Sequence, residues 1–261
     1  MELSTYHAYA DELERRLRLK TFPLAIRLLR TEEEPPGNMV RPLRDLGHHI
    51  SLCQAFEMSR RSGTPMAVLR EDMWCPEPVI GFGLQEPPVY FMEGNNRYPR
   101  DVSCREAGRI YAKELPKLPV GVYSGVLSSP LHSTPFEPDV VTIYCIPAQL
   151  STLLLAHEYK DGHNLNCDLS SHAACVYGVV PTLLTGKAQV GIPCRGDRYA
   201  AMAEDDEMLF TITSAGFEEL ITALRYLETT GTTYPQGYRL RFEYPLPKAY
   251  KEIADIMGYL E

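Results

Sequence analysis

The sequence has neither a long apolar run nor a cluster of basic residues. No stretch approaches the roughly 18 apolar residues of a membrane-spanning helix, and the first residues, 1–7, are polar and acidic, unlike a secretory signal peptide. The net charge of −8 and the scattered lysines and arginines argue against a nucleic-acid-binding surface. We therefore expect a cytoplasmic protein that binds neither membranes nor nucleic acids and whose cysteines are reduced.

Seven cysteines are present, but no two of them form a Cys-x-x-Cys pair. Most zinc and iron–sulfur sites contain that pair, so the spacing argues against a metal site of the common kinds. An odd number of cysteines also argues against a framework made purely of disulfides. The thiols are therefore candidates for buried core residues, metal ligands or reactive groups.

The remaining composition is that of an ordinary globular protein, with 44% hydrophobic and 23% charged residues. Amphipathic and buried apolar segments alternate along the chain, and turn-forming residues separate them. Helices are expected over 3–19, 43–61, 103–115, 147–157 and 214–230, and strands over 22–29, 66–70, 122–128, 140–145, 164–169 and 208–212. This alternation predicts an α/β fold, a mixed sheet with helices, in which some connections are too short for parallel crossovers.

No change of composition cuts the chain cleanly, so we expect a single domain over residues 1–261. The proline-rich stretch 129–138 separates two half-units, 20–128 and 139–230. The last segment, 234–261, is rich in Tyr and Pro before a final amphipathic helix. A segment of this kind typically covers a face of the protein or a subunit partner, so it is the candidate contact of a homo-oligomer.

Two segments share one order of features: a thiol near a helix start, a glycine, a short strand and a second thiol. The first runs from Cys53 to Cys75 with 21 residues between its thiols, and the second from Cys175 to Cys194 with 18. Such self-similarity indicates an internal duplication, a pseudo-repeat of Cys–helix–Gly–strand–Cys units. If the two halves pack about a pseudo-twofold axis, the four thiols converge on one place.

Several short stretches carry a resemblance to a known family. They are Phe22-Pro-Leu-Ala-Ile-Arg27, Cys53-Gln-Ala55, Asp72-Met-Trp-Cys-Pro76, Pro135-Phe-Glu-Pro-Asp-Val-Val141, Pro147-Ala-Gln149, Cys175, Cys194-Arg-Gly-Asp-Arg198 and Asp205-Asp-Glu-Met208. In these the chain resembles domain-of-unknown-function family 169, which occurs in anaerobic bacteria and archaea. The resemblance implies no activity, but it implies that Cys53, Cys75, Cys175 and Cys194 match family cysteines and that Cys104, Cys145 and Cys167 do not. The family's Cys-Pro-Gly-Gly is here Cys75-Pro-Glu-Pro78, so no role is expected for those glycine amides.

Four thiolates form a donor set that suits an iron–sulfur cluster or, alternatively, zinc, because soft ligands select these metals. Cys75 and Cys194 follow strands and open into turns or helix starts, where backbone N–H groups stabilise a thiolate. The expected metal ligands are Cys53, Cys75, Cys175 and Cys194. Two other interpretations remain open: small buried core thiols, and thiol chemistry at Cys75 or Cys194.

The turn after Cys194 is a second candidate site. Arg195, Gly196 and Arg198 would bind the phosphate or carboxylate of a small anionic ligand or cofactor through guanidinium and backbone N–H groups. The alternative is a solvated turn with an internal Arg–Asp pair. Residues 204–207 are likewise expected to form a solvated acidic turn.

The function expected from these residues is a cysteine-ligated iron–sulfur or other metal centre that serves electron transfer or a redox step. An acidic surface suits docking with a positively charged redox partner. The alternatives are a non-enzymatic protein that binds a small anion or cofactor beside reduced cysteines, and a thiol enzyme. No constellation of residues identifies a substrate or a catalytic base, so the sequence leaves open whether the protein is an enzyme.

Overall fold

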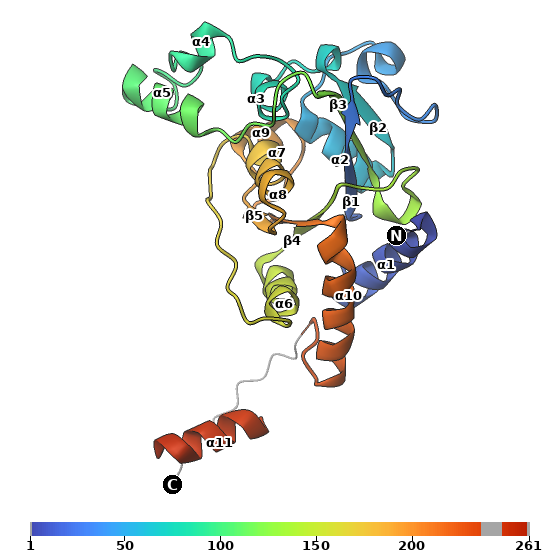
Figure 1. Cartoon of the computed structure of the whole chain (residues 1–261), viewed down its shortest axis with the longest axis vertical. Helices are drawn as coiled ribbons and strands as arrows, with labels where there is room; N and C mark the ends of the chain where they lie inside the picture. The colour runs from blue at the N-terminus through green and yellow to red at the C-terminus, as the bar shows by residue number, and fades with distance from the viewer. Residues whose placement is uncertain (1, 236–246, 260–261) are drawn as a thin grey trace.

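A six-stranded sheet forms the centre of the structure (Figure 1). The computed structural model describes residues 2–235 and 247–259. The strands are β1 (Leu24–Arg30), β2 (Met66–Leu69), β3 (Tyr123–Pro130), β4 (Val140–Cys145), β5 (Gln189–Gly191) and β6 (Met208–Thr213). Their order across the sheet is β2-β3-β1-β4-β6-β5, and each neighbouring pair is antiparallel. The α/β class is confirmed, but these ladders are all antiparallel where we expected mixed directions.

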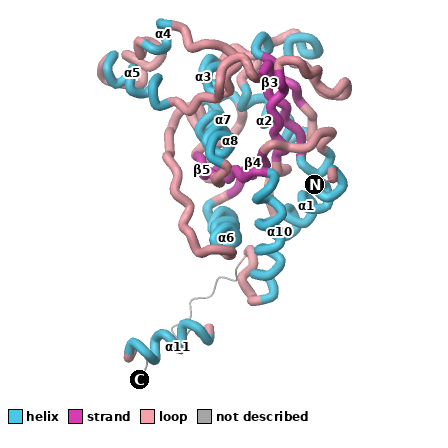
Figure 2. The backbone as a smooth tube through the Cα atoms, in the orientation of Figure 1, coloured by secondary structure: helices cyan, strands magenta, loops and turns pink. Residues whose placement is uncertain are grey.

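Helices cover both faces of the sheet (Figure 2). On one face lie α2 (Leu52–Ser62), α3 (Pro76–Gly81), α7 (Ala174–Tyr177), α8 (Val180–Thr185) and α9 (Arg195–Ala200). On the other face lie α1 (Leu3–Leu17), α6 (Pro147–Glu158) and α10 (Ser214–Thr229). Two further helices, α4 (Val89–Met92) and α5 (Arg105–Glu114), form a lobe beside the first of these layers (Figure 1).

Successive side chains of the strands enter two separate cores. In β1, Leu24, Ile26 and Leu28 belong to the core under α2 and α7, which we call the α2/α7 core. Ala25 and Leu29 belong to the core under α1, α6 and α10, which we call the α1/α10 core. Because successive residues of a strand point to opposite faces, a strand buried on both faces is mostly apolar, as β1 is apart from Arg27 and Arg30.

The sheet repeats one strand pattern about its centre. The central strands are β1 and β4. From them outward, the first half has the order β1-β3-β2 and the second half has the order β4-β6-β5. In each half a helical segment with a cysteine in its first turn ends at a left-handed glycine, Gly63 (φ 70°) or Gly186 (φ 72°), and an edge strand follows. Glycine adopts this backbone conformation without strain, which explains why it ends both segments. The strands of the two halves span 24–130 and 140–213.

Two local predictions are wrong. The helix expected over 43–61 is divided, because a π-helix covers Pro42–Leu46 and α2 begins only after Ser51. Gly47, in the left-handed conformation (φ 73°), ends the first piece, and Ser51 caps α2 by accepting the N–H of Gln54. The strand expected over 164–169 is an irregular segment, from which two side chains pack against the α1/α10 core.

The C-terminal helix α11 (Lys248–Met257) has no buried residue and lies apart from the sheet and its layers (Figure 1). The segment expected to cover a face or a subunit partner, 234–261, includes residues 236–246 and 260–261, which lie outside the described part. Contact with a partner therefore stays a prediction.

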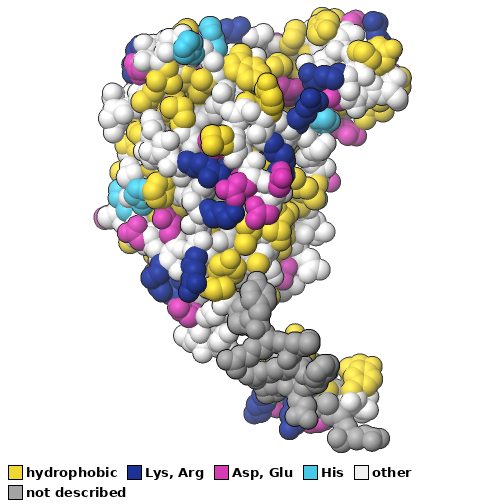
Figure 3. All heavy atoms as spheres, turned by 180° about the vertical axis from the view of Figure 1, so that it is seen from behind, with side chains coloured by type: hydrophobic (Ala, Val, Ile, Leu, Met, Phe, Trp, Pro, Cys, Tyr) yellow, Lys and Arg dark blue, Asp and Glu magenta, His cyan; other side chains and the backbone are white. Residues whose placement is uncertain are grey.

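No helix among the described residues is long and apolar enough to cross a membrane. Acidic and basic side chains lie next to one another among apolar ones on the face seen in Figure 3.

A buried ion pair joins α2 to the second half of the sheet. The side chain of Arg60 is 1% exposed and donates two hydrogen bonds to Glu207, at 2.6 and 2.9 Å. Its guanidinium also lies 4.0 Å from the centroid of the Tyr144 ring and 2.6 Å from a carboxylate oxygen of Glu57. The prediction of a solvated turn is wrong for Glu207, which is 4% exposed. Its carboxylate is the counter-charge of a guanidinium that is sealed from water.

Removing the carboxylate of Glu207 should be strongly destabilising. Glu207→Ala leaves the buried charge of Arg60 without its bidentate partner, so we expect the free energy of unfolding to fall by about 3–5 kcal/mol. Urea unfolding followed by circular dichroism measures the change. The matched control, Glu219→Ala, removes the exposed partner of Lys160 and should leave the midpoint nearly unchanged. Equal midpoints for the two variants would contradict the role assigned to the buried pair.

Glu14 of α1 is a half-buried acid that faces a histidine. Its Oε1 atom lies 3.9 Å from Nδ1 of His132. Neither atom has a hydrogen-bond partner among the described residues. Burial, with a smaller contribution from Asp11, raises the pKa of Glu14 from 4.5 to about 7. The ionised carboxylate is therefore unfavourable in the folded state.

The raised pKa of Glu14 predicts a pH-dependent stability. The folded state holds a proton that the unfolded chain releases near pH 4.5, so this stabilising contribution is complete below about pH 4.5 and is lost as the pH rises through about 7. Glu14→Gln removes the ionisable group, so the melting temperature of the variant should exceed that of the wild type at about pH 8. The difference should be small near pH 4.5. Calorimetry tests this against Glu106→Gln, an exposed control on α5, and a gain that is independent of pH would refute it.

Candidate functional site

Four cysteines from four separate segments line one cavity of about 1060 Å³. They are Cys53, Cys75, Cys175 and Cys194, the four that the repeated sequence pattern singles out. The cavity lies where the first turns of α2, α3, α7 and α9 meet, and α2 contacts both α7 and α9. Each half of the sheet therefore contributes two thiols to the same place.

Each of these thiols stands at the start of a helix. Cys53 and Cys175 are the second residues of α2 and α7, and both are buried, with exposed fractions of 8% and 6%. Cys75 and Cys194 immediately precede α3 and α9, and both are half-buried. We call the first two the inner pair and the second two the outer pair. The arrangement repeats between the two halves, because each half supplies one inner and one outer thiol.

The four thiols disfavour one another's ionisation. Burial raises the pKa of Cys175 well above its usual value, and the charges that Cys53, Cys75 and Cys194 would carry raise it further. Burial is also the largest cause of the raised pKa of Cys53, of Cys75 and of Cys194. The groups are therefore neutral thiols unless a cation is bound beside them, because burial disfavours the charged form.

Asp197 lies among the thiols, beside two of them. Its carboxylate accepts the backbone N–H of Cys194 at 3.1 Å, and the thiols of Cys194 and Cys53 lie near enough to lower its pKa. Burial raises the pKa of Asp197, and these neighbours oppose the rise. Burial raises the pKa of Cys194, and the nearby backbone N–H groups of Ala174, Asp197 and Gly196 oppose that rise. Asp197 is 2% exposed, so this position of the turn is not solvated.

Glu77 connects Cys75 to the lobe that contains α4 and α5. The thiol of Cys75 donates to Oε2 of Glu77 at 3.3 Å. The other carboxylate oxygen accepts from Asn96 at 2.8 Å and from Arg97 at 2.7 Å. Arg97 also donates to the hydroxyl of Tyr111 at 2.9 Å and lies over its ring, 4.5 Å from the centroid. One buried carboxylate therefore fixes an outer cysteine and holds the lobe at one side of the cavity.

The other three cysteines lie elsewhere. Cys145 ends β4 and faces the α1/α10 core on the opposite side of the sheet, where burial raises its pKa to about 12. Cys104 is exposed at the start of α5, and Cys167 packs against the α1/α10 core. None of these three described residues lines the cavity. The structure therefore separates the same two sets of cysteines that the resemblance separates.

The predicted anion-binding turn lies at the rim of the same cavity. Arg195, Gly196 and Arg198 all line it. Arg198 donates to the backbone carbonyl of Glu204 at 2.7 Å and lies 3.2 Å from Asp205, so its charge is paired within the protein. Arg195 is exposed and makes no side-chain hydrogen bond or ion pair with the described residues. The turn therefore offers one available guanidinium.

Three charged residues at the cavity escape the sequence patterns. Glu77, Arg97 and Asp197 are each less than a tenth exposed, although such residues normally lie at the surface. Two of them leave a signal, because Glu77 follows Cys75 by two residues and Asp197 follows Cys194 by three. An acid therefore follows each outer cysteine within one turn, just beyond the point where the repeated pattern ends. Arg97 comes from the lobe, outside the repeat, and no spacing relates it to a thiol.

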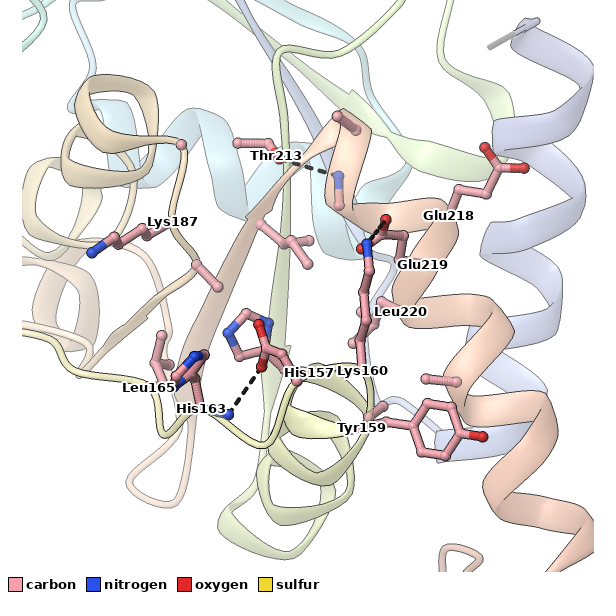
Figure 4. Close-up of a pocket in the computed structure, with 18 of the residues that line it drawn as sticks. His157, Tyr159, Lys160, His163, Leu165, Lys187, Thr213, Glu218, Glu219 and Leu220 are labelled. Atoms are coloured by element: carbon pink, nitrogen blue, oxygen red, sulfur yellow. Dashed lines mark hydrogen bonds and ion pairs between the residues drawn. The ribbon is translucent and has the colours of Figure 1, made fainter.

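A larger groove of about 1510 Å³ lies on the opposite layer, between α6 and α10 (Figure 4). Its charged lining residues are exposed, and some of them pair with one another. Lys160 lies 2.6 Å from Glu219, and Asp161 accepts the backbone N–H of His163 at 2.9 Å. Buried ionisable groups around a cavity mark a functional site more strongly than exposed ones. The thiol cavity has such groups, and we take it as the candidate site.

Comparison with known proteins gives a family but no function. No curated protein and no solved structure is similar enough to this chain to count as a match. Residues 12–223, which include all four thiols of the cavity, match DUF169, a family described as "Uncharacterised ArCR". Because this match covers most of the chain, the protein belongs to domain-of-unknown-function family 169.

Proposed function

We propose that the four cysteines of the cavity ligate an iron–sulfur cluster that serves electron transfer or a redox step. The observation that carries the proposal is their convergence: Cys53, Cys75, Cys175 and Cys194 come from four segments of the chain and line one cavity. Cysteine thiolates are the usual ligands of such clusters. A bound cluster would supply the transfer of electrons. The chain's own part is to present four sulfurs and to shield the inner pair from water.

A cluster and a single zinc ion place different demands on the spacing of the four sulfurs. Four thiolates about 2.3 Å from one zinc ion lie roughly 4 Å apart. In the described part of the chain, no three His, Cys, Asp or Glu side chains are arranged to hold one metal ion. A cluster takes its ligands at different iron atoms, so its cysteine sulfurs lie farther apart. Zinc is the alternative metal.

Metal binding would replace the protons that the buried thiols retain. Burial raises the pKa of all four thiols, and ligation exchanges each thiol proton for a bond to a metal cation. The backbone N–H groups near the sulfur of Cys194 would then act on a ligand atom, and hydrogen bonds of this kind tune a cluster's potential. The same raised pKa values weigh against the thiol-enzyme alternative, because an attacking cysteine needs a lowered pKa.

The test is the iron and acid-labile sulfide content of the full-length protein, prepared and reconstituted without oxygen. We expect both in stoichiometric amounts, with a paramagnetic signal after dithionite reduction. The single variants Cys53→Ser, Cys75→Ser, Cys175→Ser and Cys194→Ser should each lose iron, because each removes one ligand. The matched controls, Cys104→Ser and Cys167→Ser, change cysteines outside the cavity and should keep it.

Two results would overturn the assignment. A colourless protein that contains stoichiometric zinc would replace the cluster by a zinc site. A metal-free protein, whose quadruple Cys→Ser variant is as stable as the wild type, would refute a metal centre. The anion-binding alternative would then be the function that the cavity supports.

A further inference from the structure

The cavity in front of the four thiols combines apolar walls with positive charge. Its apolar lining includes Trp74, Pro76, Pro78, Ile192 and Pro193. Its charged lining consists of four arginines, Arg97, Arg100, Arg195 and Arg198, and two acids, Glu77 and Asp101. Acids face most of these arginines, and the buried carboxylate of Asp197 also lies beside the thiols. An arginine that no acid pairs is therefore the charge that would attract a ligand of the opposite sign.

Of these arginines, Arg195 is the one available to a ligand. Arg97 and Arg100 both pair with Asp101, at 2.9 and 2.8 Å. Arg198 is held by the carbonyl of Glu204, as described above. Arg195 is exposed at the cavity and has no partner among the described residues. A guanidinium in this position can bind a carboxylate or phosphate through two parallel hydrogen bonds.

Two exposed aromatic side chains line the same cavity. Trp74, the single tryptophan of the chain, is 56% exposed, and Tyr199 is 91% exposed. Tyr199 follows Arg195 by four residues in α9, so the two share one face of that helix. The backbone N–H of Trp74 donates to the carbonyl of Ile50 at 3.2 Å, which fixes Trp74 beside Cys75. Binding sites for organic molecules combine apolar and aromatic walls with a few polar groups that fix the orientation.

We infer that this cavity binds a small organic anion with a flat apolar body. Arg195 binds its carboxylate or phosphate, and Trp74 and Tyr199 contact the body. The ligand then lies beside the outer pair of thiols, Cys75 and Cys194. Binding of this molecule needs no metal. Only its role as the substrate of the iron–sulfur centre rests on the proposed function. An inorganic anion lacks the apolar body, and a neutral aromatic molecule lacks a group for Arg195.

A matched pair of fluorescent probes tests the inference on the full-length protein. Anilinonaphthalene sulfonate is an aromatic anion, and phenylnaphthylamine has the same rings without the sulfonate. Quenching of Trp74 emission reports a probe bound near the cavity, since the chain has one tryptophan. We expect Arg195→Gln to weaken binding of the anionic probe at least about tenfold, through loss of a charge-assisted contact. Binding of the neutral probe should change less than about twofold, because it makes no such contact.

A control variant and a competition complete the test. Arg15→Gln, on α1 in the opposite layer, should change neither affinity. Benzoate and phenyl phosphate should displace the anionic probe at lower concentrations than inorganic phosphate, and the better of the two identifies the charged group. Equal affinity of Arg195→Gln and the wild type for the anionic probe would overturn the inference, as would failure of that probe to quench Trp74. Displacement by inorganic phosphate as effective as that by benzoate would also overturn it.

The same measurements separate the inference from the proposed function. Probe binding is measured on the protein as isolated and after removal of any metal, and iron and sulfide are measured on the same samples. Probe binding that depends on Arg195, in a protein that contains no iron as isolated and takes up none on reconstitution without oxygen, supports the anion site and refutes the cluster. Stoichiometric iron in a protein that binds the anionic and neutral probes equally supports the cluster and refutes the anion site.

Discussion

The meeting of the four thiols depends on the buried guanidinium of Arg60. It comes from α2, the helix of the first half that carries Cys53, and it pairs with Glu207 at the start of β6 in the second half. It also lies over the ring of Tyr144 in β4. An ion pair sealed from water is costly to break, because one charge would then be buried alone. The pair therefore fixes α2 across the centre of the sheet, against α7 and α9, which begin at the other half's cysteines.

The repeated strand pattern of the two halves places the thiols similarly, and differences between the halves give them different surroundings. Each half supplies one inner cysteine in the first turn of a helix and one outer cysteine after an edge strand. Cys75 donates to Glu77, which also accepts from Arg97 of the lobe. Cys194 is instead held by Asp197 and by backbone N–H groups. The four sulfurs are therefore placed nearly symmetrically, but the hydrogen bonds around Cys75 differ from those around Cys194. Such hydrogen bonds tune the properties of a bound metal centre.

The strands, most helices and the grouping of the cysteines follow from signals that are local in the sequence. Apolar runs, prolines and glycines mark the elements, and the repeated spacing selects the four cysteines that line the cavity. Apart from the spacing of Glu77 and Asp197 from the outer cysteines, burial of charge leaves no local signal. Glu207 and Asp197 stand among polar turn residues, and each is buried because a group from a distant segment, Arg60 or Cys53, meets it there. The strand predicted over residues 164–169 is wrong for a related reason. Leu165 and Cys167 pack against the α1/α10 core, but the backbone of this segment pairs with no strand.

The two pairs of thiols differ in burial, so the cavity has a deeper end at the inner pair and a more open end at the outer pair. Cys53 and Cys175 are buried over the α2/α7 core, whereas Cys75 and Cys194 are half-buried. A molecule that approaches the four sulfurs therefore meets the outer pair first, beside Arg195. Arg195 is exposed there and has no partner among the described residues, so its guanidinium is the charge that such a molecule meets. Charges close to a site are screened less by salt than distant ones are. The position of Arg195 therefore supports the proposed anionic ligand, whatever the net charge of the whole protein.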